Sequence, residues 1–118
     1  MKTIAILGST GSIGVNTLDV IRHNRDRFNV AAMVAGSNVE LFAEQIKEFK
    51  PSLVSVFNLS KVGELKELLQ GEDVEILSGE KGSIKVATHP DASLVISAIV
   101  GSAGLVPSLA AIQSNKDL

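Results

Sequence analysis

The sequence predicts an α/β fold in which a doubly wound parallel sheet is covered by helices on both faces. Short apolar runs without alternation recur along the chain, as expected of strands buried on both faces of a parallel sheet. Longer segments with apolar residues at helical spacing separate them, and this alternation favours right-handed crossovers. With 118 residues, 45% of them apolar, the chain has the size of one domain with its own core.

The first half of the chain carries the clearest elements. Residues 3–7 are an apolar run that ends at Gly8, which predicts a buried first strand. Residues 12–24 carry apolar side chains at helical spacing and predict a first helix. A second apolar run at residues 28–34 predicts the second strand.

The next helix is predicted from its start signal. Ser37 is followed three residues later by Glu40, the pattern of a capping box, and the helix must end before Pro51. Apolar runs and turn residues then predict the rest of the chain. We expect strands at residues 53–57, 74–77 and 94–100, a helix at residues 60–70, a turn region at Gly79 and Gly82, and a last helix to about Asn115 with Pro107 in its first turn.

Three glycines lie between the first strand and the first helix, at Gly8, Gly11 and Gly14. Glycine lets the backbone turn tightly and approach a pyrophosphate, and the following helix N-terminus offers free N–H groups. This position is typical of a Rossmann-like dinucleotide-binding loop, although the spacing is G-x-x-G-x-x-G and not G-x-G-x-x-G. The alternative is a glycine-rich turn in which Ser12 only caps the helix. The candidate phosphate ligands are the hydroxyls of Thr10 and Ser12 and the amides of Gly11, Ser12 and Ile13.

The loop after the second strand predicts which dinucleotide is bound. NAD enzymes usually carry a carboxylate here for the ribose 2'-hydroxyl, whereas this loop reads Gly36, Ser37 and Asn38. Ser37, Asn38 and the next helix N-terminus can accept a 2'-phosphate, so NADPH is favoured over NADH. The loop contains no Lys or Arg, which predicts a modest preference. In the alternative, the Ser37 hydroxyl belongs to the capping box and contacts no ligand.

A third candidate segment is the small-residue stretch at residues 98–104, at the end of the last predicted strand. Open α/β sheets bind ligands at the carboxyl ends of their strands, so this stretch could lie along the nicotinamide half of the cofactor. A helix-opening turn with small residues for close packing explains it equally well, and both interpretations stay open.

Composition excludes several classes of function. A net charge of −2 provides no basic surface for nucleic acid or an anionic membrane, and without cysteine no disulfide or thiolate zinc site can form. Gly8 interrupts any signal-peptide core and no apolar run approaches about 18 residues, so we expect a protein that is neither exported by a signal peptide nor membrane-spanning. No nucleophile with a base is visible in the sequence. A loose group of acids reads as a solvated face and not as a metal site: Glu64, Glu67, Glu72, Asp73 and Glu75.

Residues 6–14, which read ILGSTGSIG, and residues 17–20, which read TLDV, resemble the N-terminal signature of the 1-deoxy-D-xylulose 5-phosphate reductoisomerase family. Residues 34–38, 98–101 and 104–109 extend the resemblance along the whole chain. The resemblance implies an NADPH-dependent enzyme of the non-mevalonate pathway of isoprenoid biosynthesis. Such an enzyme converts 1-deoxy-D-xylulose 5-phosphate to 2-C-methyl-D-erythritol 4-phosphate with a divalent metal, Mg or Mn, as a homodimer in bacterial cytoplasm.

The resemblance also implies which residues contact NADPH. Many members of the family have a basic residue where this chain has Ser37. The family's later Asn-Lys-Glu stretch and its acidic metal ligands have no counterpart before Leu118, so we expect residues 1–118 to be an NADPH-binding Rossmann-type domain that is inactive alone. The alternatives are a stand-alone dinucleotide-binding module and another NADP dehydrogenase of the semialdehyde type, against which the extent of the resemblance argues. The implied cofactor contacts are Thr10, Gly11, Ser12, Ile13, Gly36, Ser37 and Asn38.

Overall fold

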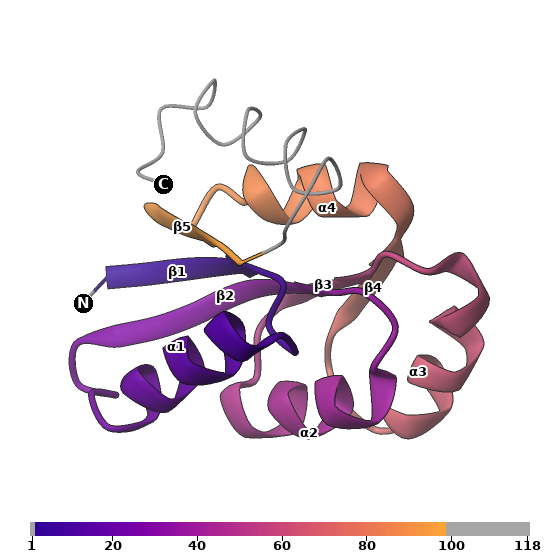
Figure 1. The fold of residues 1–118 in the computed structure, drawn as a ribbon, viewed down its shortest axis with the longest axis horizontal. Coiled ribbons are helices and arrows are strands. Elements are labelled where there is room, and N and C mark those ends of the chain that lie inside the picture. The colour runs from indigo at the N-terminus through magenta and orange to yellow at the C-terminus, as the bar shows by residue number, and fades with distance from the viewer. Residues whose placement is uncertain (1, 99–118) are drawn as a thin grey trace.

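A computed structural model describes residues 2–98, and these form a five-stranded sheet in which every strand is parallel to its neighbours (Figure 1). The order across the sheet is β4-β3-β2-β1-β5. The predicted α/β class is confirmed. The strands are β1 Lys2–Leu7, β2 Phe28–Ala35, β3 Leu53–Val56, β4 Glu75–Ser78 and β5 Leu94–Ser97.

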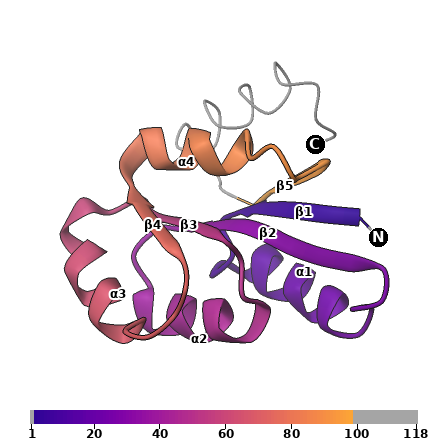
Figure 2. The same ribbon diagram turned by 180° about the vertical axis from the view of Figure 1, so that it is seen from behind.

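Helices cover both faces of this sheet, as a doubly wound fold requires. Figures 1 and 2 show α1, α2 and α3 together on one face and α4 on the other. Within residues 2–98, no helix is both long enough and apolar enough to cross a membrane. The helices are α1 Ser12–Arg22, α2 Val39–Phe49, α3 Val62–Leu68, which follows the 3-10 turn η1 Leu59–Lys61, and α4 Gly79–Ala87.

Successive strands are added first on one side of β1 and then on its other side. The crossovers through α1, α2 and α3 place β2, β3 and β4 successively on one side of β1, and the crossover through α4 then places β5 on its other side. β1 is therefore the strand at which the order of strand addition changes sides. Ligands of open α/β sheets bind at such a switch point, outside the carboxyl ends of the strands.

The two faces of the sheet differ in the size of the core that they bury. The larger apolar cluster lies between the sheet and α1, α2 and α3, with Phe42, Ile46 and Leu65 at its centre. The smaller cluster lies under α4 and consists mainly of Ala and Val side chains. Strand residues alternate between the two clusters, so β1 is buried on both faces, which explains its uninterrupted apolar sequence.

The predicted turn region at Gly79 and Gly82 is wrong, because both residues lie in helix α4. Gly82 faces the sheet, where a Cβ atom would lie 2.1 Å from Ser55 Oγ and 3.1 Å from Leu77 Cβ. Glycine at this position permits a close approach of helix to sheet, and it does not mark a turn. This helix carries the chain back across the sheet to β5.

The structure describes only part of the last two predicted elements, the strand at residues 94–100 and the helix that follows it. The strand predicted at residues 94–100 is present as β5, which ends at Ser97. The predicted helix to about Asn115 lies outside the described residues, as does most of the stretch at residues 98–104.

Candidate functional site

The loop at residues 8–11 joins β1 to α1 and is fastened to the end of β2. The Gly8 and Ser9 N–H groups both donate to the Val34 carbonyl oxygen, at 2.8 and 3.0 Å. Gly8 has a φ of 93°, in the region that favours glycine, and Gly11 N–H donates back to its carbonyl at 3.4 Å. The loop is therefore a tight turn over the carboxyl ends of β1 and β2.

Gly14 allows α1 to begin directly against this loop. A Cβ atom at Gly14 would lie 2.1 Å from the Gly8 carbonyl oxygen and 2.6 Å from Ser9 Cα. At Gly11, by contrast, the nearest atom to an added Cβ is 3.8 Å away, an ordinary contact. Of these two glycines, Gly14 is the one that packing requires, and it serves the helix–loop contact.

The N-terminus of α1 keeps its backbone donors available. Gly11 is the N-cap, and no side chain caps the helix or adds a negative charge in its first turn. The alternative in which Ser12 caps the helix is therefore wrong, because Ser12 is already the first helical residue. Ser12 and Ile13 are exposed, and the Ile13 side chain is 57% accessible despite being apolar. Free N–H groups and the positive end of the helix dipole at one exposed point suit an anion.

The second loop lies at the same edge of the sheet, and its residues Gly36, Ser37 and Asn38 are all exposed. The predicted capping box is wrong: helix α2 begins at Val39, and the Asn38 side chain is its N-cap, accepting from Leu41 N–H at 3.3 Å. Ser37 stands one residue too early to cap. Its hydroxyl oxygen instead accepts a hydrogen bond from another loop.

That other loop contributes Asn58, which sequence reasoning missed. Asn58 Nδ2 donates to Ser37 Oγ at 3.2 Å, and its backbone N–H donates to the Gly36 carbonyl at 3.1 Å. The Asn58 Oδ1 atom accepts from Ser60 N–H and Oγ, at 3.1 and 2.8 Å, so the side chain is held from both ends. Because Ser37 Oγ already accepts from Asn58, its own O–H remains free to donate to a ligand. The sequence signal that could have identified Asn58 is its position, because it is a polar residue shortly after the buried strand β3.

The end of β5 completes this edge. Ala98 N–H donates to the Leu7 carbonyl oxygen at 2.7 Å, which places the start of the third candidate segment beside the glycine loop. The remaining residues of that segment, 99–104, lie outside the described part of the chain.

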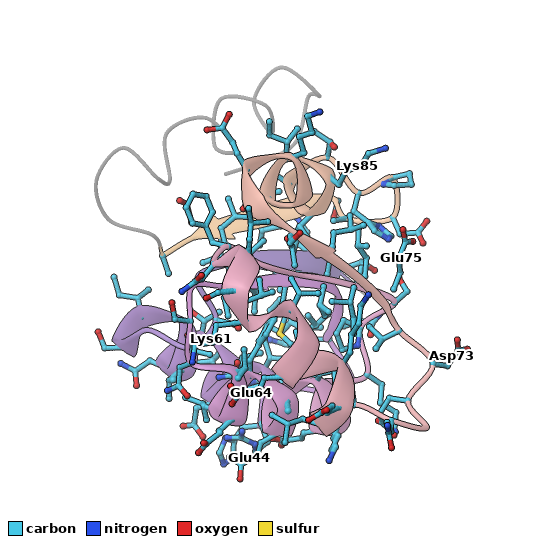
Figure 3. All side chains as sticks on the ribbon, turned by 90° about the vertical axis from the view of Figure 1, so that its right-hand side faces the viewer. Glu44, Lys61, Glu64, Asp73, Glu75 and Lys85 are labelled. Carbon is cyan, nitrogen blue, oxygen red and sulfur yellow. The ribbon has the colours of Figure 1, made fainter. Side chains whose placement is uncertain are left out.

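Acidic side chains do not gather near these loops or elsewhere in residues 2–98. No group of three or more His, Asp or Glu side chains in this part of the chain is arranged to hold a metal ion. Figure 3 shows Glu64, Asp73 and Glu75 at separate points on the surface. Lys61 and Glu64 form a partly exposed ion pair at 3.7 Å.

The structure brings the seven predicted contact residues to the edge of the sheet at which β1 and β2 end. They lie in the two loops and at the N-terminus of α1.

Comparisons with known proteins give a consistent result. The family model described as 1-deoxy-D-xylulose 5-phosphate reductoisomerase matches residues 4–118. The chloroplastic reductoisomerase of Mentha piperita is 56% identical over 119 residues, which cover 99% of this chain and 25% of that protein. The reductoisomerase of Geotalea uraniireducens is 51% identical over the full chain and 31% of its own length.

Solved structures agree with these sequence relatives. The reductoisomerase of Zymomonas mobilis in complex with NADPH superimposes with a TM-score of 0.92 at 38% identity, covering 98% of this chain and 30% of that one. A reductoisomerase structure with NADPH, fosmidomycin and magnesium has a TM-score of 0.94 at 36% identity, covering 98% of this chain and 29% of that one. This chain therefore spans a quarter to a third of the length of these relatives.

Proposed function

The chain belongs to the 1-deoxy-D-xylulose 5-phosphate reductoisomerase family, and on that premise we propose that residues 1–118 form the NADPH-binding domain of such an enzyme. The observation that carries the proposal is the glycine loop with the uncapped N-terminus of α1, at the switch point of the sheet. A reductoisomerase of similar fold was solved in complex with NADPH. A stand-alone module without catalysis is not favoured, because the relatives are longer enzymes.

The first loop fits the cofactor's pyrophosphate. The amides of Ser12 and Ile13 provide donors at an exposed helix terminus, and no side chain competes for them. The Gly11 amide makes only a long hydrogen bond of 3.4 Å to the Gly8 carbonyl oxygen, which a phosphate oxygen can replace. The hydroxyls of Thr10 and Ser12 can add further donors. NADPH supplies a hydride when it is bound, and these residues bind and orient the dinucleotide that carries it.

The second loop fits a 2'-phosphate. Gly36, Ser37 and Asn38 are exposed and contain no carboxylate, and an added Cβ at Gly36 would meet no atom within 4 Å, so the space beside the loop is open. The free Ser37 hydroxyl proton can donate to a phosphate oxygen. Without a cation in this loop, the preference for NADPH over NADH is expected to be modest, because charge-assisted hydrogen bonds are the strong ones.

The whole protein's activity is part of the same proposal. We propose that it converts 1-deoxy-D-xylulose 5-phosphate to 2-C-methyl-D-erythritol 4-phosphate, as a homodimer in the cytoplasm, and that residues 1–118 alone are inactive. The cysteine-free sequence is compatible with that compartment. We assign the divalent metal, Mg or Mn, to ligands outside residues 2–98, since that part of the chain offers no cluster for it. Magnesium is present in a related reductoisomerase structure.

Calorimetric titration of the 118-residue chain with NADPH and separately with NADH tests the proposal. Calorimetry is needed because the sequence contains no Trp or Tyr for intrinsic fluorescence. We expect both dinucleotides to bind and NADPH to bind more tightly. Absence of binding by either would contradict a self-sufficient cofactor domain, and tighter binding of NADH would contradict the role of the second loop.

A further inference from the structure

Gln45 is a polar residue on the buried face of α2. Its side chain is 6% accessible and lies among the apolar residues of the larger core, next to Ile46 and one turn from Phe42. A core-facing position of an amphipathic helix is normally apolar, since burial of an amide is unfavourable unless it is hydrogen-bonded. The amide at Gln45 therefore needs an explanation.

Its hydrogen bond leads to the glycine loop, 36 residues away in sequence. Gln45 Nε2 donates to the Ser9 carbonyl oxygen at 2.8 Å, and this bond is buried. Ser9 itself is fully buried, and its N–H donates to the Val34 carbonyl at 3.0 Å. Both backbone polar groups of Ser9 are thus held, one by the end of β2 and the other by the side chain on α2.

Fixing the Ser9 carbonyl also fixes the next N–H group. The peptide between Ser9 and Thr10 is planar and trans, so its C=O and N–H point in opposite directions. With the carbonyl directed at Gln45 on α2, the Thr10 N–H is directed away from α2. Among the described residues it has no hydrogen-bond partner. An N–H group oriented in this way at the start of the phosphate-binding turn is a donor for a ligand.

We propose that Gln45 is a positioning residue for the cofactor, which holds the glycine loop so that the Thr10 N–H points at the pyrophosphate. The inference rests on the proposed dinucleotide-binding function, and it adds a residue that touches no ligand. It also joins the two loops, because Asn38 in the second loop is the N-cap of α2 and Gln45 on the same helix reaches the first loop.

A purely structural role accounts less well for this residue. Within residues 2–98, the Gln45 Oε1 atom and the Ser9 Oγ atom are both buried without a hydrogen-bond partner, so only the amide nitrogen of the glutamine is satisfied there. An unbranched apolar side chain of similar size would fill the same space without an orphan oxygen. Gln45→Met is therefore expected to fold, and of the hydrogen bonds at this position it removes the one donated to the Ser9 carbonyl.

The test compares Gln45→Met and Gln45→Glu with matched changes at the exposed Gln70, Gln70→Met and Gln70→Glu. NADP⁺ is titrated calorimetrically, because it survives acid. We expect Gln45→Met to bind about tenfold more weakly than wild type, and the Gln70 variants to match wild type. We expect the ¹⁵N order parameters of Thr10 and Gly11 to fall in Gln45→Met without ligand, because the Ser9 carbonyl is no longer held.

Gln45→Glu adds a pH-dependent readout. Burial raises the pKa of the introduced carboxyl, so a larger fraction of it is protonated near pH 5 than near pH 8, and only the protonated form can donate to the Ser9 carbonyl. The affinity ratio of wild type to Gln45→Glu is expected to be large at the higher pH and to shrink at the lower pH. Taking the ratio removes the titration of the cofactor's own phosphate.

The outcomes separate this inference from the proposed function. If wild type binds no dinucleotide, the proposed function fails, and the order parameters still decide whether Gln45 holds the loop. If wild type binds, and Gln45→Met binds within about twofold of it with unchanged order parameters, Gln45 has no positioning role. A lower unfolding midpoint with unchanged affinity would mark the residue as structural and also overturn the inference.

Discussion

The loop after β1 and the loop after β2 lie at the same edge of one sheet, yet they are held in different ways. The first is packed: Ser9 is fully buried, and Gly14 leaves no room for even a methyl group between α1 and the turn. The second is open: Gly36, Ser37 and Asn38 are exposed, and an added Cβ at Gly36 would meet nothing within 4 Å. Side-chain hydrogen bonds from Asn38 and Asn58 hold it in place.

This difference suits the two tasks that we propose for the two loops. A pyrophosphate is common to every dinucleotide, so a rigid backbone cradle fixed by packing suits it. The 2'-phosphate distinguishes one dinucleotide from another, and an exposed loop held by side chains can change residues there at little cost to the fold. Ser37, which is exposed and lies outside α2, is such a position.

Gly14→Ala is the strongest test of the packed loop, and we expect it to lower the free energy of unfolding by about 3 kcal/mol. Helix propensity alone predicts the reverse sign, since alanine is favoured over glycine inside a helix by about 1 kcal/mol. The steric term should prevail because the Cβ would meet backbone atoms at 2.1 and 2.6 Å, which cannot rotate away. Urea unfolding followed by circular dichroism measures the change, and NADPH binding should be lost with it.

Two matched substitutions isolate the steric cause. Gly63→Ala changes a glycine in helix α3 whose Cβ would meet nothing within 4 Å, and we expect stabilisation by up to about 1 kcal/mol. Gly36→Ala changes the open loop, and we expect a shift within about 0.5 kcal/mol. If Gly14→Ala behaves like Gly63→Ala, the two loops do not differ in packing.

Ser37→Lys sharpens the comparison by adding a cation to the open loop. We expect NADPH to bind about tenfold more tightly and NADH to be unchanged, because only NADPH carries the 2'-phosphate for a charge-assisted hydrogen bond. The gain should weaken as salt is added, since the loop is exposed. Calorimetry with both dinucleotides measures it. Ser93→Lys adds the same charge at an exposed serine just before β5, at the opposite edge of the sheet, and should change neither affinity.

Asn58→Asp tests whether hydrogen bonds hold the open loop in its binding form. The carboxylate can still accept from Ser60 N–H, so the start of η1 is kept, but it cannot donate to Ser37 Oγ. It also places a negative charge beside the expected 2'-phosphate. We expect NADPH to bind about threefold more weakly with NADH unchanged. Asn29→Asp, near the start of β2, is the charge-matched control, and equal losses in both variants would point to net charge as the cause.

The packed loop was predictable from sequence because its determinants are local. Apolar residues up to Leu7, followed by Gly8, Gly11 and Gly14, define a strand, a turn and a helix within a short stretch, and the structure places each as expected. The second loop could also be placed beside the first, because neighbouring parallel strands have their carboxyl ends at the same edge of the sheet. Fold class and the two candidate loops therefore followed from local patterns alone.

The features that were missed depend on tertiary contacts. Gly82 looks like a turn residue in sequence, and only its contact with Ser55 shows that it serves helix packing. Asn58 and Gln45 act across long stretches of sequence, on Ser37 and on Ser9. The position of Asn58 after a buried strand is visible in the sequence, but the identity of its partner is not. Ser37 and Asn38 are adjacent and both are favourable N-cap residues, so the capping-box pattern did not show which of them caps α2.

The smallest expected effect lies at the end of α1 and α2 that is remote from both loops. There Glu48 pairs with Arg22, and its pKa is lowered below the ordinary value of 4.5, first by the hydrogen bond from Arg22 and then by the nearby charges of Arg22 and Arg25. A lowered folded-state pKa stabilises the fold above pH 4.5, and this contribution is lost as the pH falls through the folded-state value.

Glu48→Gln should therefore reduce the free energy of unfolding by about 0.5 kcal/mol near pH 7, because solvent screens a pair whose Glu48 side chain is 37% exposed. Near pH 2 the difference should be smaller, because this contribution is lost as the pH falls through the lowered folded-state pKa of Glu48. Urea unfolding at the two pH values measures this, and a difference that persists undiminished in acid would point to lost packing instead of lost charge. NADPH affinity should stay at the wild-type value, because neither loop depends on the far ends of these helices.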